Sequence, residues 1–309
     1  MLEREFSIKK GGGVKIKYPS LYDITNKRSE NNQRYYFAAL RSEYLLLISS
    51  AVNAFLQYDY KYYTALFLFT ILMLMVVFKL KSKFEREWYK YRAVTESIKT
   101  ISWKFSMKSE PFNDKDEPRN ISQLASYLEG IVGGSEFISK SIDSVSVLES
   151  TVSDEMKNIR KLNLDDRRDV YVKYRIDDQR DWYIGKAQSN KNLSLYWGVV
   201  VFCIYLFAFL CSLYNAFLTQ NTESLIPISL VTTIASALVG WVQVKRYSEL
   251  SASYFLTAHE IGIIKEQSSY ISGENDFSEF VRDAETAFSR EHTQWLARRV
   301  ANRQAPIKH

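Results

Sequence analysis

The sequence predicts an all-α membrane protein with four transmembrane helices in two helical hairpins and long cytoplasmic helical extensions. The clearest evidence is a pair of neighbouring stretches without a charged residue, 193–218 and 224–244. A helix needs about 20 apolar residues to cross a hydrocarbon core of roughly 30 Å, so both stretches are long enough. Neither stretch alternates apolar and polar residues as a barrel strand does, and hydrocarbon offers no partner for free backbone amides. The spanning segments are therefore expected to be helical.

The second observation is where the basic residues lie. They cluster on the outer flanks of the apolar stretches, whereas the two short connecting loops together hold only Lys61. Because basic segments stay on the cytoplasmic side, both termini and the long middle segment are predicted to be cytoplasmic. The flanking basic residues are Lys27, Arg28, Arg34, Arg41, Lys79, Lys81, Lys83, Arg86, Lys90, Arg92, Arg175, Arg180, Lys186, Lys191, Lys245 and Arg246.

Taken in order, the chain begins with a charged segment, 1–17, which contains three consecutive glycines and is expected to be a flexible tail. The first two spans are predicted at about 42–58 and 62–80. The first is short, because its uncharged run covers only 44–58. Amphipathic aromatic rings favour the headgroup layer, and four of them surround the predicted turn. These are Tyr58, Tyr60, Tyr62 and Tyr63.

The stretch 82–107 is predicted to form a long helix with an apolar seam, because large side chains recur at alternating spacings of four and three residues. The seam contains Phe84, Trp88, Tyr91, Ile98 and Phe105. It can pack against other helices of the same chain, or it can join neighbouring subunits of an assembly.

Pro111 and Pro118 end this helix, and amphipathic helices are predicted at 121–131 and 135–161. The segment 165–182, which is dense in Arg and Asp at helical spacing, is expected to be a helix with a solvated charged face.

After the fourth span, a helix is predicted at 247–267, and Gly273 interrupts the chain before a terminal amphipathic helix. An apolar stripe on this last helix is expected to fold back onto the other cytoplasmic helices. The stripe contains Phe277, Phe280, Val281, Ala284, Ala287, Phe288 and Trp295.

Polar residues within the spans are the candidate functional residues. Ser49, Asn53 and Gln57 recur every fourth residue and so share one face of a helix. A polar stripe in lipid faces protein or water, so it either forms interhelical hydrogen bonds or lines an aqueous path in an assembly.

Small residues form a second stripe, Thr232, Ser236 and Gly240, on the fourth span. Such stripes let helix backbones approach closely. This stripe is expected to pack against the third span, with subunit association as the alternative.

The sequence gives no support for an enzyme, a cofactor or a metal site. It lacks the phosphate loop, the HExxH metalloprotease motif and the GxSxG elbow. Cys203 and Cys211 lie inside one span, which excludes a CxxC metal knuckle, and His259 beside Glu260 points about 100° away from it on a helix. The net charge of +6 gathers next to the membrane, so anionic lipid headgroups are expected as partners rather than nucleic acid.

Several segments resemble SLATT domains, the two-transmembrane effector domains associated with SMODS and SLOG proteins. Residues 175–190, from Arg-Ile-Asp-Asp-Gln to Ala-Gln-Ser-Asn, resemble the entry to such a hairpin. Residues 88–99, with Glu-Pro-Phe at 110–112, resemble the exit from a related hairpin. The segment 287–295 is similar to a C-terminal signature of these proteins. The resemblance predicts tandem SLATT modules at 18–160 and 161–309.

This resemblance implies a prokaryotic effector of conflict or antiphage systems in the cell inner membrane. Such proteins are expected to form homo-oligomers and to permeabilise the membrane when a cytoplasmic signal, such as a nucleotide messenger or a sensor protein, triggers them. The family has no accepted catalytic residues to transfer. A regulated ion channel, or a membrane-anchored sensor scaffold without a killing role, is the alternative.

Overall fold

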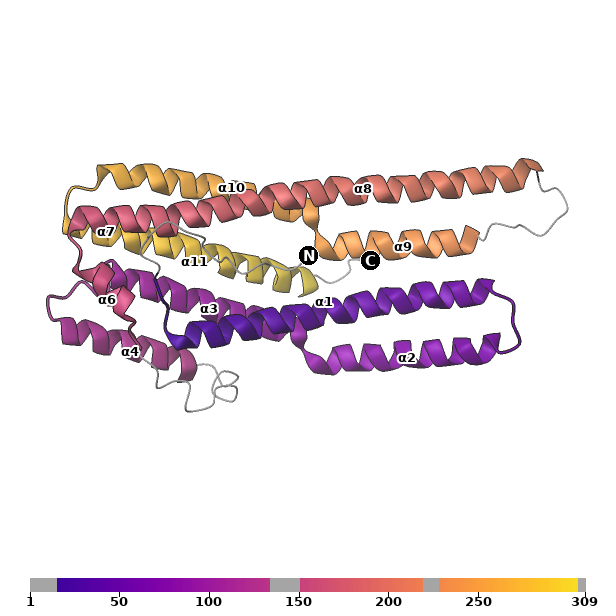
Figure 1. Ribbon diagram of the computed structural model, residues 1–309, viewed down its shortest axis with the longest axis horizontal. Coiled ribbons are helices and arrows are strands. Elements are labelled where there is room, and N and C mark those ends of the chain that lie inside the picture. The colour runs from indigo at the N-terminus through magenta and orange to yellow at the C-terminus, as the bar shows by residue number, and fades with distance from the viewer. Residues whose placement is uncertain (1–15, 134–150, 219–227, 305–309) are drawn as a thin grey trace. The chain divides into compact units, whose positions relative to one another are not determined.

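The computed structural model describes residues 16–133, 151–218 and 228–304, and every regular element in these ranges is helical. The predicted all-α fold class is confirmed for this part of the chain. In chain order the helices are α1 (Ser20–Phe55), α2 (Lys61–Ser82), α3 (Phe84–Ser106), α4 (Glu117–Gly133), α6 (Asp154–Lys161), α7 (Leu164–Tyr171), η1 (Val172–Asp177), α8 (Asp178–Leu218), α9 (Ile228–Lys245), α10 (Tyr247–Gln267), η2 (Ser268–Tyr270) and α11 (Glu274–Gln304). Figure 1 labels the α-helices.

Some predicted segments fall partly outside the described residues. These are the tail at 1–17, the helix at 135–161 up to residue 150, and the start of the span at 224–244. Where the structure resumes, α6 begins at Asp154 and α9 at Ile228. The helix α6 lies inside its predicted range, and α9 extends one residue beyond the end of its own.

The chain folds as two compact units, and each unit draws residues from both halves of the sequence. We call residues 27–91 and 180–261 the membrane unit, and residues 1–26, 92–179 and 262–309 the bundle unit. The tandem halves therefore do not form one compact unit each. Contacts within either unit join segments that are distant in the sequence.

In the membrane unit, α1 and α2 run antiparallel and are joined by a short turn (Figure 1). Near that turn, the side-chain amide of Asn53 donates a hydrogen bond to the carbonyl of Lys61 at 3.2 Å. Towards the other end of the pair, the ammonium group of Lys79 forms an ion pair with Glu43. These contacts at both ends fix the register of the two helices.

A single basic residue in the left-handed backbone conformation ends each of two membrane-unit helices. Lys83, with φ 52°, lies between α2 and α3, and Arg246, with φ 50°, lies between α9 and α10. An aromatic residue, Phe84 or Tyr247, starts the following helix in both cases. The two halves of the sequence thus repeat the same one-residue break after their second apolar helix.

The bundle unit is built around a core of large side chains that are almost fully buried. Its α3 ends in a hydrogen-bonding pattern typical of a Schellman motif, in which the amide of Ser109 donates to the carbonyl of Lys104 and that of Lys108 to Phe105. The largest core side chains are Ile98, Trp103, Phe105, Met107, Phe112, Leu124, Met156, Ile159, Tyr171 and Phe277.

The predicted return of the terminal helix onto the other helices is confirmed. Phe277, Val281, Ala284 and Phe288 of α11 are buried, and the ring of Phe277 lies 6.3 Å from that of Tyr171 in α7. For Trp295, which ends the predicted stripe, the side chain lies outside the described residues.

Candidate functional site

Three helical stretches among the described residues are long and apolar enough to cross a membrane. They are Lys61–Ser106, Leu164–Tyr214 and Ile228–Tyr270. These stretches include α2, most of α8, and α9, which correspond to the predicted second, third and fourth spans. The described residues therefore include apolar helices of membrane length in both halves of the sequence.

The large side chains of α2 and α8 face outwards. The helix α2 has no buried residue, and Leu66, Phe67 and Met73 are each more than half exposed. On α8, Phe202 and Phe209 are also mainly exposed. Such continuous apolar surface is unfavourable in water and matches the acyl chains of a bilayer.

The predicted first span, 42–58, is not among these three stretches. Its helix α1 carries Arg41 and Glu43 just before the uncharged run, and Ser49, Ser50 and Asn53 reduce its apolar character. A fourth crossing, and with it the arrangement in two transmembrane hairpins, stays a prediction.

The predicted polar stripe on α1 does not continue to its last member. Ser49 is exposed and Asn53 is buried, but α1 ends at Phe55, so Gln57 lies in the following turn. Asn53 donates to the Lys61 carbonyl and accepts a hydrogen bond from the hydroxyl of Tyr58. Its amide therefore closes the turn between α1 and α2.

The small-residue stripe on α9 meets α1. A Cβ atom built on Gly240 would lie 2.9 Å from the hydroxyl oxygen of Tyr44 and 3.3 Å from the ring. The other two members, Thr232 and Ser236, are exposed. Close approach at this stripe is thus observed at Gly240, and the neighbour belongs to the first half of the sequence rather than to α8.

The apolar seam of α3 makes contacts within the chain along its length. In the membrane unit, the ring of Phe84 lies 5.4 Å from Tyr35, and that of Trp88 lies 5.8 Å from Phe37. The remaining members, Tyr91, Ile98 and Phe105, are at most 5% exposed.

The charged segment at 165–182 differs from the expected solvated face. Arg167 is fully buried and Arg175 is 2% exposed. Arg175 does not pair with Asp178, its neighbour at helical spacing, but with Glu285 of α11, which is also fully buried. The expectation of a solvated face is therefore wrong for these two arginines, because α11 covers them.

Glu285 is the centre of a buried polar cluster in the bundle unit. Both of its carboxylate oxygens accept a hydrogen bond from Arg175 at 2.7 Å. One oxygen also accepts from the hydroxyl of Tyr171 at 3.0 Å, and the other from that of Thr100 at 3.0 Å. Four interactions thus satisfy a buried charge that would otherwise be very unfavourable.

The cluster sits at an irregular stretch of helix. Arg175 belongs to η1, a π-helical segment between α7 and α8, and such segments often mark functional sites. Thr100, Arg175 and Glu285 come from α3, η1 and α11, so the cluster joins helices from both halves of the sequence. We refer to Thr100, Tyr171, Arg175 and Glu285 as the Glu285 cluster.

A second buried arginine, Arg160 of α6, joins the loop after α3 to α4. Its side chain donates to the Phe105 carbonyl at 2.5 Å, to the Phe112 carbonyl at 2.8 Å, and to the carboxylate of Glu117 at 2.9 Å. Burial lowers the pKa of Arg160, while the hydrogen bonds and charge of Glu117 oppose that shift. The guanidinium remains a cation and holds three segments together.

Arg167 of α7 is less completely satisfied. One of its terminal nitrogens pairs with Glu274, and its guanidinium lies 5.8 Å from the centre of the Phe277 ring. The other two nitrogens have no hydrogen-bond partner among the described residues. Burying these nitrogens without a hydrogen bond costs free energy, and contact of the guanidinium with the aromatic face offsets part of that cost.

The sequence contained a signal for the Glu285 cluster that the sequence-based prediction did not use. Glu285 lies one turn after Val281 and three residues before Phe288, which places a carboxylate on the apolar stripe of α11. A carboxylate on a buried stripe favours a buried cation as its partner. The partner could not be identified, because nothing in the sequence relates α11 to η1.

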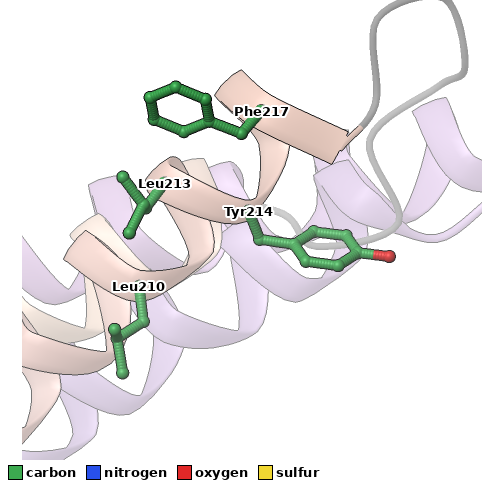
Figure 2. A pocket seen from close by; sticks show the side chains of 4 residues that line it. All are labelled: Leu210, Leu213, Tyr214 and Phe217. Carbon is green, nitrogen blue, oxygen red and sulfur yellow. The ribbon is translucent and has the colours of Figure 1, made fainter.

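The described residues show no grouping that suggests catalysis. No three His, Cys, Asp or Glu side chains in this part of the chain are close enough to hold a metal ion. His259 and Glu260 are both exposed on α10. An apolar recess lies at the end of α8, where Leu210, Leu213, Tyr214 and Phe217 line an open surface (Figure 2). Its lining suits an acyl chain better than a polar substrate.

Comparisons with known proteins identify the two halves separately. Residues 19–168 match the model of SMODS and SLOG-associating 2TM effector domain 3, and residues 171–295 match that of SMODS and SLOG-associating 2TM effector domain 1. No curated protein and no solved structure matches the chain.

Proposed function

The chain belongs to the SLATT family, with two of these domains in tandem, and from this premise we propose that it is a membrane effector of a prokaryotic conflict or antiphage system. In this proposal it resides in the inner membrane, assembles as a homo-oligomer and permeabilises the bilayer when a cytoplasmic signal reaches the bundle unit. The signal is a nucleotide messenger or a sensor protein. The role is non-enzymatic.

One observation carries the proposal. Two effector domains cover residues 19–295, and both contribute helices of membrane length whose large apolar side chains are exposed. An exposed apolar surface of this extent needs lipid or further protein to cover it. The described residues offer exposed apolar surface in both domains, which supports a role in the membrane, and they show no catalytic grouping.

The Glu285 cluster supplies a means of control in this proposal. With the cluster intact, α11 is held against α3 and η1. A signal that displaces α11 separates Arg175 from Glu285, which costs about 3–5 kcal/mol where Arg175 stays buried. The protein therefore stays in its resting state until ligand or partner binding supplies a comparable free energy.

Inducible expression in a bacterial host tests the function. Membrane potential, followed with a voltage-sensitive dye, and growth are recorded together. We expect depolarisation to precede growth arrest when the natural trigger is co-expressed. As a control, Leu206→Arg combined with Phe209→Arg places two charges in α8 and should abolish the effect, because charges in a lipid-facing helix oppose insertion.

The outcomes separate the candidate functions. Depolarisation followed by arrest supports the effector. Ion conductance without arrest supports a regulated channel. If neither occurs with the trigger present and the protein in the membrane, the chain is a sensor scaffold and the proposal is wrong.

A further inference from the structure

Arg167 of α7 lies in the core of the bundle unit with only part of its guanidinium in use. The side chain is fully buried. Its Nη2 atom donates a hydrogen bond to the carboxylate of Glu274, whereas Nε and Nη1 have no hydrogen-bond partner among the described residues. Buried donors without an acceptor are rare, because each one costs free energy. These two donors therefore suit an acceptor from outside the described part of the chain.

The geometry of the ion pair explains why two donors are left over. A guanidinium holds a carboxylate or a phosphate with two parallel hydrogen bonds through Nη2 together with either Nε or Nη1. A carboxylate bonded to Nη2 alone completes neither of these edges. In the same unit, Nε and Nη2 of Arg175 donate to the two oxygens of Glu285, each at 2.7 Å. Glu274 is thus a weaker partner for Arg167 than Glu285 is for Arg175.

Positive charge is in excess around Arg167. Lys108, in the turn after α3, has a lowered pKa, because burial and the charges of Arg167 and Arg160 outweigh the opposing charges of Glu274 and Glu117. The groups that act on Lys108 and Lys108 itself thus count as three cations and two carboxylates. Arg160 and Glu117 already pair with each other. One further negative charge would balance the remaining groups.

Glu274 marks a route from the surface to the buried guanidinium. Its side chain is 58% exposed at the start of α11, although its carboxylate contacts Arg167. Lys108 is also partly exposed. A terminal phosphate carries up to two negative charges and three acceptor oxygens, so it can bond two nitrogens of one guanidinium and still face a second cation. It matches the charges and donors here better than one carboxylate does.

We propose that Arg167 and Lys108 form a binding site for the terminal phosphate of a phosphorylated ligand, which enters by displacing Glu274. The phosphate accepts hydrogen bonds from Nη2 of Arg167 and from Nε or Nη1, and Lys108 balances its second charge. Nucleotides and phospholipid headgroups share this chemistry. Displacement of Glu274 also removes a contact that holds the start of α11. The link from binding to triggering rests on the proposed function, whereas the binding itself does not.

Isothermal titration calorimetry of the purified full-length protein in detergent tests the site, with inorganic pyrophosphate as the probe at constant ionic strength. We expect saturable binding to the wild-type chain. Glu274→Gln should tighten binding about tenfold, because phosphate no longer has to break a hydrogen bond between two charged groups. Lys108→Gln should weaken binding about fivefold, as expected for the loss of a partly exposed ion pair. Both side chains reach the surface, so the fold should survive these changes better than the loss of the buried Arg167.

Two exposed residues of the bundle unit provide matched controls. Glu279→Gln removes a carboxylate from the same helix as Glu274, and Lys173→Gln removes a lysine from η1. Both should leave the affinity nearly unchanged. ADP and phosphatidic acid, titrated separately, then distinguish a nucleotide from a lipid headgroup as the source of the phosphate.

Three results would overturn the proposal. The first is the absence of saturable pyrophosphate binding, and the second is an affinity that Glu274→Gln does not raise. The third is an equal effect of the site and control substitutions, which would indicate a diffuse response to charge. Because the titration contains no membrane potential and no trigger, its outcome is independent of the depolarisation experiment, and either proposal can fail alone.

Discussion

Glu285 is a charged residue that lies in the core of the bundle unit. Both carboxylate oxygens are used twice, and the side chain is fully buried. We predict that Glu285→Gln lowers the free energy of unfolding by about 3–5 kcal/mol, because Arg175 is left as a buried unpaired charge. Thermal unfolding of the purified protein, followed by circular dichroism, measures the loss.

Glu279→Gln, on the exposed face of the same helix, is the control and should change stability by less than about 0.5 kcal/mol. Replacing both partners, with Arg175→Leu and Glu285→Leu, should recover most of the loss, since the buried charge is then gone. A Glu285→Gln variant as stable as the control would show that the pair does not hold α11.

Lys108 occupies the position after α3 at which glycine is usual. Its φ of 54° is left-handed, and burial together with the charge of Arg167 lowers the pKa of its ammonium group. We predict that Lys108→Gly stabilises the protein by about 1 kcal/mol, because it removes the backbone strain and a charge that its surroundings disfavour.

Lys108→Ala is the informative comparison, because alanine removes the charge but keeps the strain. Chemical denaturation of the three proteins separates the two contributions. If alanine stabilises as much as glycine, the backbone conformation contributes nothing and the interpretation of the helix end is incorrect.

At the scale of helices, α1 and α9 approach closely at Gly240. We predict that Gly240→Ala costs about 1–3 kcal/mol, the usual range for inserting a methyl group into a packed contact, because the new methyl group would meet Tyr44. Tyr44→Phe in the same chain should restore part of the lost stability, since it removes the hydroxyl oxygen that lies nearest to the new methyl group. Thermal melting in detergent provides the measurement.

Gly198→Ala on α8 is the matched control, because nothing lies within 4 Å of the added methyl group. It should be neutral or mildly stabilising, as expected when alanine replaces glycine inside a helix. Equal behaviour of the two alanine variants would contradict the close contact between α1 and α9.

Most helices were predictable from the sequence, and the reasons differ from helix to helix. The helix predicted at 247–267 is α10 with the same ends, and that at 121–131 lies inside α4. The end of α1 was missed, because a spacing of four residues identifies a face only while the helix continues. Gln57 keeps the spacing, but it lies beyond the end of α1, in the turn that the hydrogen bonds of Asn53 close.

At the scale of the whole molecule, the tandem family match was anticipated, whereas the composition of the compact units was not. Local patterns report which face of a helix is apolar, but they do not report which distant face covers it. Thr100 with Glu285 and Ser109 with Ser278 pair residues from opposite halves of the sequence. Both contacts lie in the bundle unit, which the sequence halves build jointly.

The number of membrane crossings is also a property of the whole chain. If 42–58 spans the bilayer, the turn between α1 and α2 faces the outside while the middle segment stays inside. We predict that Asp59→Cys reacts with a membrane-impermeant maleimide in intact cells, and that Lys115→Cys reacts only after lysis. Both are made in a chain that lacks Cys203 and Cys211. Protection of the Asp59→Cys thiol until lysis would remove the first span from the topology.

The one-residue breaks at Lys83 and Arg246 have a mechanical consequence. Backbone hydrogen bonds continue on both sides of Arg246, to Val242 and from Leu250, and Glu87 likewise bonds back to Lys83. Because a single residue joins the two helices, we expect that rotation of one helix about its axis also rotates its neighbour. A twist at the start of α3 would therefore turn the exposed apolar surface of α2 about its own axis.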